Sequence, residues 1–356
     1  MLWDHARQAM CGLTALKGIK TYALKNIAGN IIMRLLLTLA ILCFNYICIL
    51  AFTNPLKSDH GADPFMVYSD GYYYLLTTTA NDVQIRRAST LGGLKTGIQK
   101  VVWKDSAPDR CCNVWAPEIH NMDGTWYIYY TAGRSGNQAI DTQRMHAVKG
   151  SSSDIWASTW SYAGRLVVPN RDTRGIDGTV MTLSSGKYWL YSSYDGDEQC
   201  LWIAKMNGPL SLENGYKISA PTNPWERIKR NINEGPAPIT HNGRTWIIYS
   251  ASSCETKNYS LASLELVGSD PLQMSSWKKS SGPIFNSTNG SWGPGHNGFF
   301  YSPTGAPWMV YHASPTSYSG CDDTRRTMAQ RIGYHSDGSL NLGQPRPLSE
   351  NIPEPV

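Results

Sequence analysis

The pattern of apolar and polar positions changes once along this chain of 356 residues. A long apolar run occupies residues 35–52, and after it helical periodicity is nearly absent. Short apolar runs there alternate with Gly, Asn, Asp and Pro, which is typical of strands joined by turns. The first pair of runs surrounds Asp70-Gly71, and this dipeptide predicts a tight hairpin because glycine tolerates the positive φ that the turn needs. Residues 54–356 are therefore predicted to be all-β.

The hairpin pattern recurs five times, each time as a strand, a turn around a glycine, and an aromatic-rich strand that ends in small polar residues. The five segments are DPFMVYSDGYYYLLTTT (63–79), APEIHNMDGTWYIYYTA (116–132), GTVMTLSSGKYWLYSS (178–193), GPAPITHNGRTWIIYSAS (235–252) and GHNGFFYSPTGAPWMVYHAS (295–314). Their turn glycines, 53 to 62 residues apart, are Gly71, Gly124, Gly186, Gly243 and Gly305. Each interval suits a four-stranded blade with its loops, so the repeat predicts a single five-bladed β-propeller. A sandwich with coincidental hairpins is the alternative.

A polar or aromatic residue stands near the start of the first strand of each repeat. Asp63 lies eight residues before its turn glycine, and Trp115, Asp177, Glu234 and His296 each lie nine residues before theirs. We expect these five residues to hold equivalent places and, if the first strand lines the central channel, to meet at one mouth of it. Each also has a structural alternative when taken alone, since Asp-Pro and Asp-Gly favour turns and a histidine or tryptophan can belong to the core.

Three carboxylates at the mouth of a channel suggest glycoside hydrolysis. One carboxylic acid protonates the leaving oxygen while an ionised carboxylate activates water or attacks directly. Across a channel, a separation of roughly 6.5–9.5 Å leaves room for water and predicts inversion of the anomeric centre. A third carboxylate beside the acid raises its pKa by like-charge repulsion. A propeller that binds carbohydrate without catalysis is the alternative from another class, and it would need neither acid nor base.

The segment before the predicted propeller has the pattern of a targeting signal. Residues 33–53 contain one basic residue, an 18-residue apolar run and a small residue before a polar stretch, which predicts a secretory signal peptide that begins at Met33. The protein is then secreted and extracellular. The run is also nearly long enough to span a membrane, so a signal anchor over residues 35–52 is the alternative. Residues 1–32 are left as a leader of uncertain status.

Charge and cysteine content exclude some classes of protein. The formal net charge is +5, but residues 1–53 carry five basic residues against one acidic residue, which leaves +1 for the rest. A near-neutral, aromatic-rich domain gives no electrostatic indication of nucleic-acid binding. None of the later cysteines has the paired CxxC spacing of a zinc site, and their pairing stays open. They are Cys111, Cys112, Cys200, Cys254 and Cys321, and three sequons at Asn258, Asn286 and Asn289 suit a secretory route.

Several blocks of the sequence resemble glycoside hydrolase family 43. They are ADPF…DGYYYLLTTT, VWAPEIH…GTWYIYYTAG, GIDGTV, NEGPAPITHNGRTWIIYSAS and GPGHNGFF, and they occur in the order expected for that family. The likeness runs from about Phe52 to the C-terminus, including RRTMAQRIGYHSDGSLNLGQP. The sequence most resembles the secreted fungal α-L-arabinofuranosidases, some of which are exo-acting on α-1,5-linked arabinan. The resemblance implies a five-bladed propeller and an inverting reaction.

The resemblance also implies a role for individual residues. Asp63 would be the general base, Asp177 the modulator of the acid's pKa and its orienter, and Glu234 the general acid. Trp115 would line the sugar pocket. The family has an arginine that reaches the substrate, and the local alignment lets either Arg325 or Arg326 match it; of the two we favour Arg325.

Two further expectations come from the resemblance. His296 would be the axial histidine that holds a calcium ion or its waters in many relatives, although no cofactor is required for the chemistry. Adjacent Cys111 and Cys112 also resemble the fungal group, which makes a disulfide between them near the pocket conceivable.

The expected function is the release of terminal α-L-arabinofuranosyl residues from arabinan- or arabinoxylan-type polysaccharides or oligosaccharides of the plant cell wall. β-Xylosidase and endo-α-1,5-arabinanase are the alternatives within the family, because related propellers carry the same triad. We expect a monomer that does not bind nucleic acid. We also expect no attachment to a membrane, unless the apolar run is not cleaved and remains as an anchor.

Overall fold

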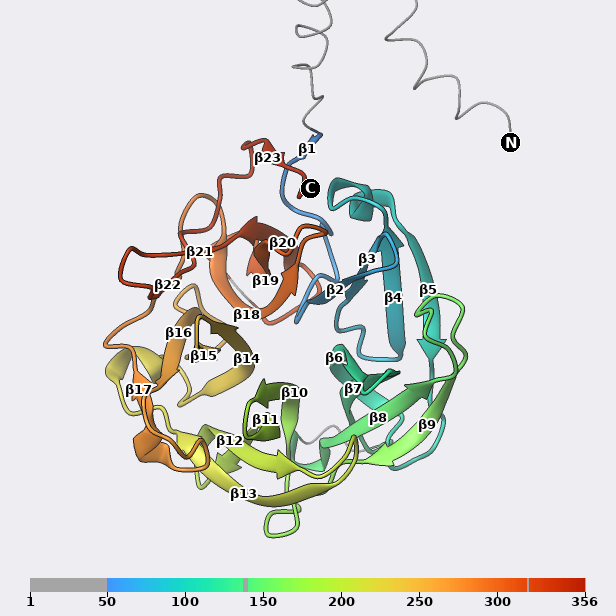
Figure 1. Cartoon of the computed structure of the whole chain (residues 1–356), viewed down its shortest axis with the longest axis vertical. Coiled ribbons are helices and arrows are strands. Elements are labelled where there is room, and N and C mark those ends of the chain that lie inside the picture. Colours follow the sequence, from blue (N-terminus) through green and yellow to red (C-terminus); the bar gives the residue numbers. More distant parts are fainter. Residues whose placement is uncertain (1–49, 137–139, 319, 356) are drawn as a thin grey trace, which may run out of the picture. The chain divides into compact units, whose positions relative to one another are not determined.

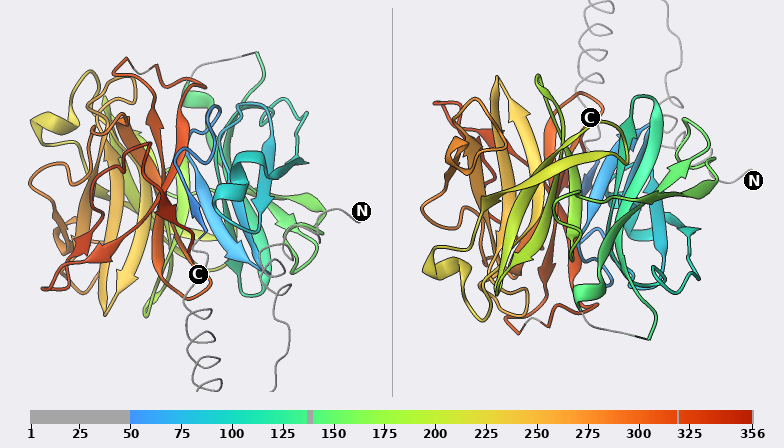
Figure 2. Two further views of the ribbon diagram at one scale, coloured as in Figure 1. Left: turned by 90° about the horizontal axis from the view of Figure 1, so that it is seen from above. Right: turned by 90° about the horizontal axis from the view of Figure 1, so that it is seen from below.

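The structure is a computed structural model that describes residues 50–136, 140–318 and 320–355. In these residues five larger antiparallel sheets surround a central axis, as Figure 1 shows, and two short strand pairs lie outside them. Four of the five sheets have four strands and the fifth has three, in each case in chain order. The side views of Figure 2 show the strands running roughly along the axis. The predicted five-bladed β-propeller is confirmed.

The five sheets are the blades, numbered 1 to 5 along the chain. Blade 1 contains β2 (Phe65–Ser69), β3 (Tyr72–Leu76), β4 (Val83–Ala88) and β5 (Ile98–Trp103). Blade 2 contains β6 (Cys112–Met122), β7 (Thr125–Gly133), β8 (Arg144–Gly150) and β9 (Trp160–Arg165). Blade 3 contains β10 (Ile176–Leu183), β11 (Gly186–Asp195), β12 (Glu198–Met206) and β13 (Leu212–Ser219). Blade 4 contains β14 (Asn233–His241), β15 (Arg244–Ala251), β16 (Ser260–Leu266) and β17 (Trp277–Lys279). Blade 5 contains β18 (Trp292–Tyr301), β19 (Pro307–Ser314) and β20 (Arg326–Arg331).

The remaining elements are short. The strand pairs are β1 (Ala51–Phe52) with β23 (Ile352–Pro353), and β21 (Gly333–Tyr334) with β22 (Leu340–Asn341). The 3₁₀ helices are η1 (Gly92–Thr96), η2 (Ile140–Thr142), η3 (Pro224–Glu226) and η4 (Met274–Ser276).

The first strand of each blade is its innermost strand. Each innermost strand contacts those of the two neighbouring blades, and β18 contacts β2, which closes the ring. Between blades 5 and 1 the closure is apolar, since Tyr73 and Leu75 pack in one core cluster with Phe300 and Trp308. Burial of such side chains is the main favourable contribution to folding. The ring places the starts of the five innermost strands around one end of the axis, as the repeat pattern predicted.

The innermost strands of blades 2 to 5 are each interrupted by a bulge near their start. The ladder between the first two strands shifts register at this point in blades 2 to 5, where two residues oppose one. The first residue of each bulge has a positive φ, between 45° and 56°. In blade order these residues are Ala116, Asp177, Gly235 and His296, and Asp63, which precedes β2 in blade 1, has the same left-handed conformation with a φ of 51°.

The bulges correct one prediction. Trp115 and Glu234 pair with the second strand one residue before the bulge, so they do not hold the same place as Asp63, Asp177 and His296. Counting residues back from the turn glycine did not reach equivalent positions, because the glycine does not hold the same place in every turn. In blades 1, 2 and 4 the glycine is the second residue of a two-residue turn with two positive φ values, whereas in blade 3 it follows the turn and in blade 5 the turn is longer.

Hydrogen bonds between blades fix these bulges. The backbone N–H of Ala116 donates to Thr78 Oγ1 of blade 1 at 2.8 Å, and the N–H of His296 donates to Ser250 Oγ of blade 4 at 2.7 Å. At the closure of the ring the N–H of Asp63 donates to His312 Nδ1 of blade 5 at 3.0 Å. The polar residues that end the second strands therefore hold the bulge of the next blade in position.

The predicted leader falls mostly outside the described residues. This holds for residues 1–32 and for residues 33–49 of the predicted signal peptide. The last part of that segment is described: Ala51 and Phe52 form β1, and Phe52 is buried in the core between blades 5 and 1. The folded domain thus starts before the predicted boundary at residue 54. In the described part of the chain, no helix has the length and apolar character needed to cross a bilayer.

Candidate active site

A pocket of about 390 Å³ lies where the innermost strands begin. Its lining includes all six residues that the sequence singled out: Asp63, Trp115, Asp177, Glu234, His296 and Arg325. They come from all five blades, with Arg325 on the loop before β20, so the pocket exists only once the ring has closed. The structure confirms that these side chains gather at one end of the channel, although Trp115 and Glu234 lie one residue before the position that the others share.

Asp63 is surrounded by cationic and hydroxyl donors. Its Oδ1 lies 3.2 Å from Nη1 of Arg325 and 3.3 Å from Nδ1 of His296, and its Oδ2 accepts a hydrogen bond from the hydroxyl of Thr78 at 2.6 Å. Burial alone would raise the pKa of Asp63, but Arg325 and His296 outweigh it and hold that pKa well below its usual range. Asp63 is therefore an ionised carboxylate at neutral pH.

His312 supports Asp63 from the ring closure. Its Nδ1 accepts the Asp63 N–H, so the imidazole is neutral at that nitrogen, and burial lowers the pKa of His312 to about 4. Its ring stacks on Tyr259, with centroids 5.6 Å apart and planes 6° apart. A neutral, stacked imidazole fixes the backbone of Asp63 without adding a charge.

Asp177 lies in a different environment. Its Oδ2 accepts one hydrogen bond from the N–H of Gly235, at 3.0 Å, which places it beside the peptide bond that follows Glu234. Burial raises the pKa of Asp177 to about 7; the charges of Glu234 and Asp63 add to this effect, while His296 opposes it. This carboxyl group therefore holds a proton far more readily than that of Asp63.

Glu234 is held by two neutral donors. Tyr259 donates its hydroxyl to Oε1 at 2.9 Å, and Gln199 donates its amide to Oε2 at 2.7 Å. Gln199 is itself fixed, because Nη1 of buried Arg174 donates to its Oε1 at 3.1 Å. The carboxyl group of Glu234 therefore has one defined orientation, with both oxygens bonded.

The backbone before Glu234 is anchored by a buried carboxylate. Glu226 is fully buried, and its Oε1 accepts hydrogen bonds from Lys279, Tyr249 and Asn233. The pKa of Glu226 is lowered: burial would raise it, but the hydrogen bonds, above all from Lys279, outweigh that effect. The network fixes Asn233, and with it the start of β14.

His296 lies among the three carboxyl groups. Burial would lower its pKa, but the charges of Asp63, Asp177 and Glu234 raise it. Next to it, Asn297 has a buried amide whose two polar atoms find no hydrogen-bond partner among the described residues. Calcium typically takes about six to eight oxygen ligands, and no group of three or more His, Cys, Asp or Glu in the described ranges is arranged to ligate a metal. These side chains do not form a calcium shell by themselves, so the ion stays a prediction.

Sequence reasoning missed four residues that contact the carboxyl groups: Thr78, Gln199, Tyr259 and His312. Thr78 and His312 belong to the small polar endings of the aromatic strands, so the repeat contained a signal for them. Gln199, at the start of the third strand of blade 3, and Tyr259, in the loop before β16, follow no repeated pattern.

Four of the five later cysteines form disulfides. One bond joins Cys111 to Cys112, and another joins Cys254 to Cys321, while Cys200 is free and buried. The first pair lines a cavity of about 300 Å³ that shares Ala80 with the main pocket. The second pair lines the main pocket itself. The conceivable bond between the adjacent cysteines is present in the structure.

A five-bladed propeller with three carboxyl groups at the start of its inner strands defines a class of glycoside hydrolases. Residues 52–340 match the profile of "Glycosyl hydrolases family 43", and the chain belongs to this family. The resemblance drawn from the sequence blocks is confirmed.

Characterised relatives are similar over most of the chain. It is 34% identical to an "Extracellular exo-alpha-(1->5)-L-arabinofuranosidase" of Streptomyces avermitilis, over 83% of this chain and 63% of that protein. It is also 34% identical to "Alpha-L-arabinofuranosidase 43" of Humicola insolens, over 80% of this chain and 62% of that protein. The chain thus matches a little under two thirds of the length of these relatives. The crystal structure of an α-L-arabinofuranosidase from Lactobacillus brevis has a TM-score of 0.77 at 31% identity, covering 84% of this chain and 98% of that one.

Proposed function

We propose that this protein is an inverting exo-acting glycoside hydrolase that releases terminal α-L-arabinofuranosyl residues from arabinan- or arabinoxylan-type polysaccharides and oligosaccharides. One observation carries the proposal: three carboxyl groups from three blades meet in one pocket, each with a different set of partners. The names of the similar proteins support the choice of arabinofuranose over other sugars.

Asp63 acts as the general base. Its carboxylate stays ionised because Arg325 and His296 face it, so it can accept a proton from a water molecule. The resulting hydroxide attacks the anomeric carbon. The bonds that Asp63 makes through its backbone to His312 and through its side chain to Thr78 hold it in one orientation during this step.

Glu234 acts as the general acid. It gives its proton to the glycosidic oxygen as the bond to the leaving sugar breaks. Asp177 stands beside the Glu234–Gly235 peptide, and its negative charge, when it is ionised, makes it easier for the nearby acid to hold its proton until the leaving oxygen takes it. Base and acid lie on blades 1 and 4, which are not neighbours in the ring. This arrangement supports a separation that admits water and hence inversion.

Two further residues of the pocket, Trp115 and Arg325, contact the sugar. Half-buried Trp115 presents an aromatic face of the kind on which sugars stack, and Arg325 provides donors towards hydroxyl groups. We also propose that the protein is a secreted monomer with a calcium ion near His296 that no chemical step uses. The targeting pattern of residues 33–53 and the word "Extracellular" in the names of two relatives support secretion.

The test compares the wild-type protein, secreted from a host cell, with its Asp63→Asn variant. Both are incubated with linear α-1,5-arabino-oligosaccharides, and products are followed by proton NMR from the first minutes. We expect β-arabinofuranose to appear first, one unit at a time, and the variant to be slower by at least about 100-fold.

Other products would overturn parts of the proposal. Short oligomers instead of single sugars would mean an endo-arabinanase, and early α-arabinofuranose would mean retention. Xylose released only from xylo-oligosaccharides would mean a β-xylosidase. Binding of these sugars without any product would mean a carbohydrate-binding propeller.

A further inference from the structure

The disulfide between Cys254 and Cys321 joins two loops at the edge of the pocket. Cys254 lies on the loop between β15 and β16 of blade 4, and Cys321 lies on the loop between β19 and β20 of blade 5. The two cysteines are 67 residues apart in the sequence, and both line the pocket. The bond therefore crosses from one wall of the site to another.

The loop of Cys321 holds Arg325 by its backbone. Nη2 of Arg325 donates to the carbonyl of Cys321 at 3.1 Å, and Nε donates to the carbonyl of Asp322 at 3.1 Å. Nη1 is left to donate to Oδ1 of Asp63 at 3.2 Å. The position of the guanidinium against Asp63 is thus set by the backbone of residues 321 and 322, one of which is the disulfide-bonded cysteine.

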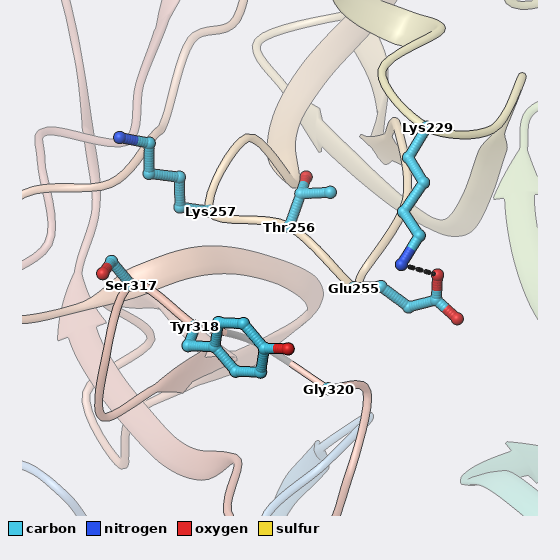
Figure 3. A pocket seen from close by; sticks show the side chains of 7 residues that line it. All are labelled: Lys229, Glu255, Thr256, Lys257, Ser317, Tyr318 and Gly320. Carbon is cyan, nitrogen blue, oxygen red and sulfur yellow. Dashed lines mark ion pairs between the residues drawn. The ribbon is translucent and has the colours of Figure 1, made fainter.

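The loop of Cys254 belongs to the acid side of the site. It runs from β15 to Tyr259, whose hydroxyl bonds to Glu234. Beyond the disulfide, a cavity of about 520 Å³ opens between the two loops. Figure 3 shows Thr256 on one loop and Tyr318 on the other across this space, with Glu255 turned to an ion pair with Lys229 rather than to the opposite loop. Packing of these side chains therefore does not replace the covalent bond.

We propose that the Cys254–Cys321 disulfide positions Arg325 against the carboxylate of Asp63, by tying the loop that carries the arginine to the loop of blade 4. The two cysteines are positioning residues, which act through Arg325, and the inference rests on the proposed function of Asp63. Without the bond, the loop of Cys321 gains freedom, and the donors of Arg325 no longer point to one place. A misplacement of about 1 Å near a reacting group costs up to about 100-fold in rate.

The test uses the Cys254→Ser/Cys321→Ser double variant, with Cys111→Ser/Cys112→Ser as the matched control, because the latter removes the other disulfide. We expect the first pair of substitutions to lower kcat by about 10- to 100-fold, with a smaller change in KM. The control is expected to stay within about threefold of the wild type. In an Arg325→Met background, loss of the Cys254–Cys321 bond should cost little more, because both changes remove the same interaction.

A second measurement does not depend on activity. The Cys111→Ser/Cys112→Ser protein is labelled with ¹⁵N-arginine, and the Nε–H signal of Arg325 is assigned by its loss in Arg325→Lys. After mild reduction of the remaining disulfide, hydrogen exchange of this Nε–H should accelerate by at least about tenfold, since exchange reports local opening. The same measurement keeps the inference testable if the Cys254→Ser/Cys321→Ser variant fails to fold.

The outcomes separate the two proposals. Accelerated exchange in a protein that releases no sugar would leave the positioning role standing and overturn the proposed function. Unchanged exchange and unchanged kcat, with only a lower Tm, would overturn the positioning role and leave the disulfide as a cross-link that stabilises the fold. The positioning role would also be contradicted if the losses of kcat from Arg325→Met and from removal of the Cys254–Cys321 bond were additive.

Discussion

Asp63 and the pair formed by Asp177 and Glu234 occupy the same pocket but have opposite surroundings. Asp63 faces Arg325, His296 and a hydroxyl group, and its pKa is well below the usual range. Asp177 has a single backbone donor, and burial raises its pKa to about 7. Glu234 has two donors, both of them neutral. The two aspartates show that the partners of a carboxyl group, rather than its residue type, set the direction in which its pKa moves.

The largest effect is expected for the acid side. Glu234→Gln cannot donate a proton to the leaving oxygen, so hydrolysis of α-1,5-arabino-oligosaccharides should fall by about 10³-fold or more. A 4-nitrophenyl arabinofuranoside has a leaving group that needs little protonation, and its hydrolysis should fall far less. Both rates are measured under saturating substrate. Equal losses on the two substrates would remove Glu234 from the role of acid.

Glu265→Gln provides the matched control for that substitution. Glu265 lies on β16 of the same blade as Glu234, but it pairs with Arg244 at 2.6 Å rather than facing the pocket. Its substitution should leave both rates unchanged. The contrast separates loss of a proton donor from a general weakening of blade 4.

A smaller effect, on stability, is expected for Asp177. Because its pKa in the folded protein is raised above the unfolded value of 3.8, its stabilising contribution is complete below that value and is lost as the pH rises through about 7. Asp177→Asn keeps an oxygen for the Gly235 N–H and removes this loss. Relative to the wild type, the variant should gain a few kcal/mol of unfolding free energy between pH 5 and pH 8, at about 1.4 kcal/mol per pKa unit.

Calorimetric Tm values of the two proteins across this pH range provide the check. A difference in Tm that grows with pH is the expected result, together with a loss of activity of about 10²-fold or more. Parallel Tm curves would show that Asp177 is ionised throughout, and the contrast between the two sides of the pocket would then disappear.

The smallest effect is expected for Tyr259→Phe. The variant removes one of the two donors that orient Glu234, so kcat should fall by about 3- to 10-fold, the range expected for one neutral hydrogen bond. The matched control is Tyr129→Phe, which removes the hydrogen bond from another buried tyrosine to the carbonyl of Pro209, outside the pocket lining. The control should lower the Tm without changing kcat. A reversed result would mean that Tyr259 only packs against His312.

The sequence predicted the propeller and the gathering of the three carboxyl groups because both follow from one repeated pattern. Register was harder, since the turn glycine does not hold the same place in every turn, and counting back from it misplaced Trp115 and Glu234 by one position. The partners of the carboxyl groups were harder still. Gln199 and Tyr259 approach Glu234 from a neighbouring strand and a loop, and the pairing of Cys254 with Cys321 links two loops that lie outside the repeated pattern.

The bulges also explain which acids the site uses. At the first position of a bulge the backbone is left-handed, a conformation that Gly, Asp, Asn and His tolerate better than residues with longer side chains. Asp177 and His296 stand at such positions and Asp63 has the same left-handed backbone before β2, whereas Glu234 stands one residue earlier and leaves the left-handed position to Gly235. A glutamate at either aspartate position would meet a backbone penalty of about 1 kcal/mol, and its extra methylene would carry the carboxyl group away from the donors that hold the aspartate. The mixture of two short acids and one long acid is thus a consequence of backbone handedness, and exchange of acid lengths within the triad is closed to this scaffold unless the bulges change as well.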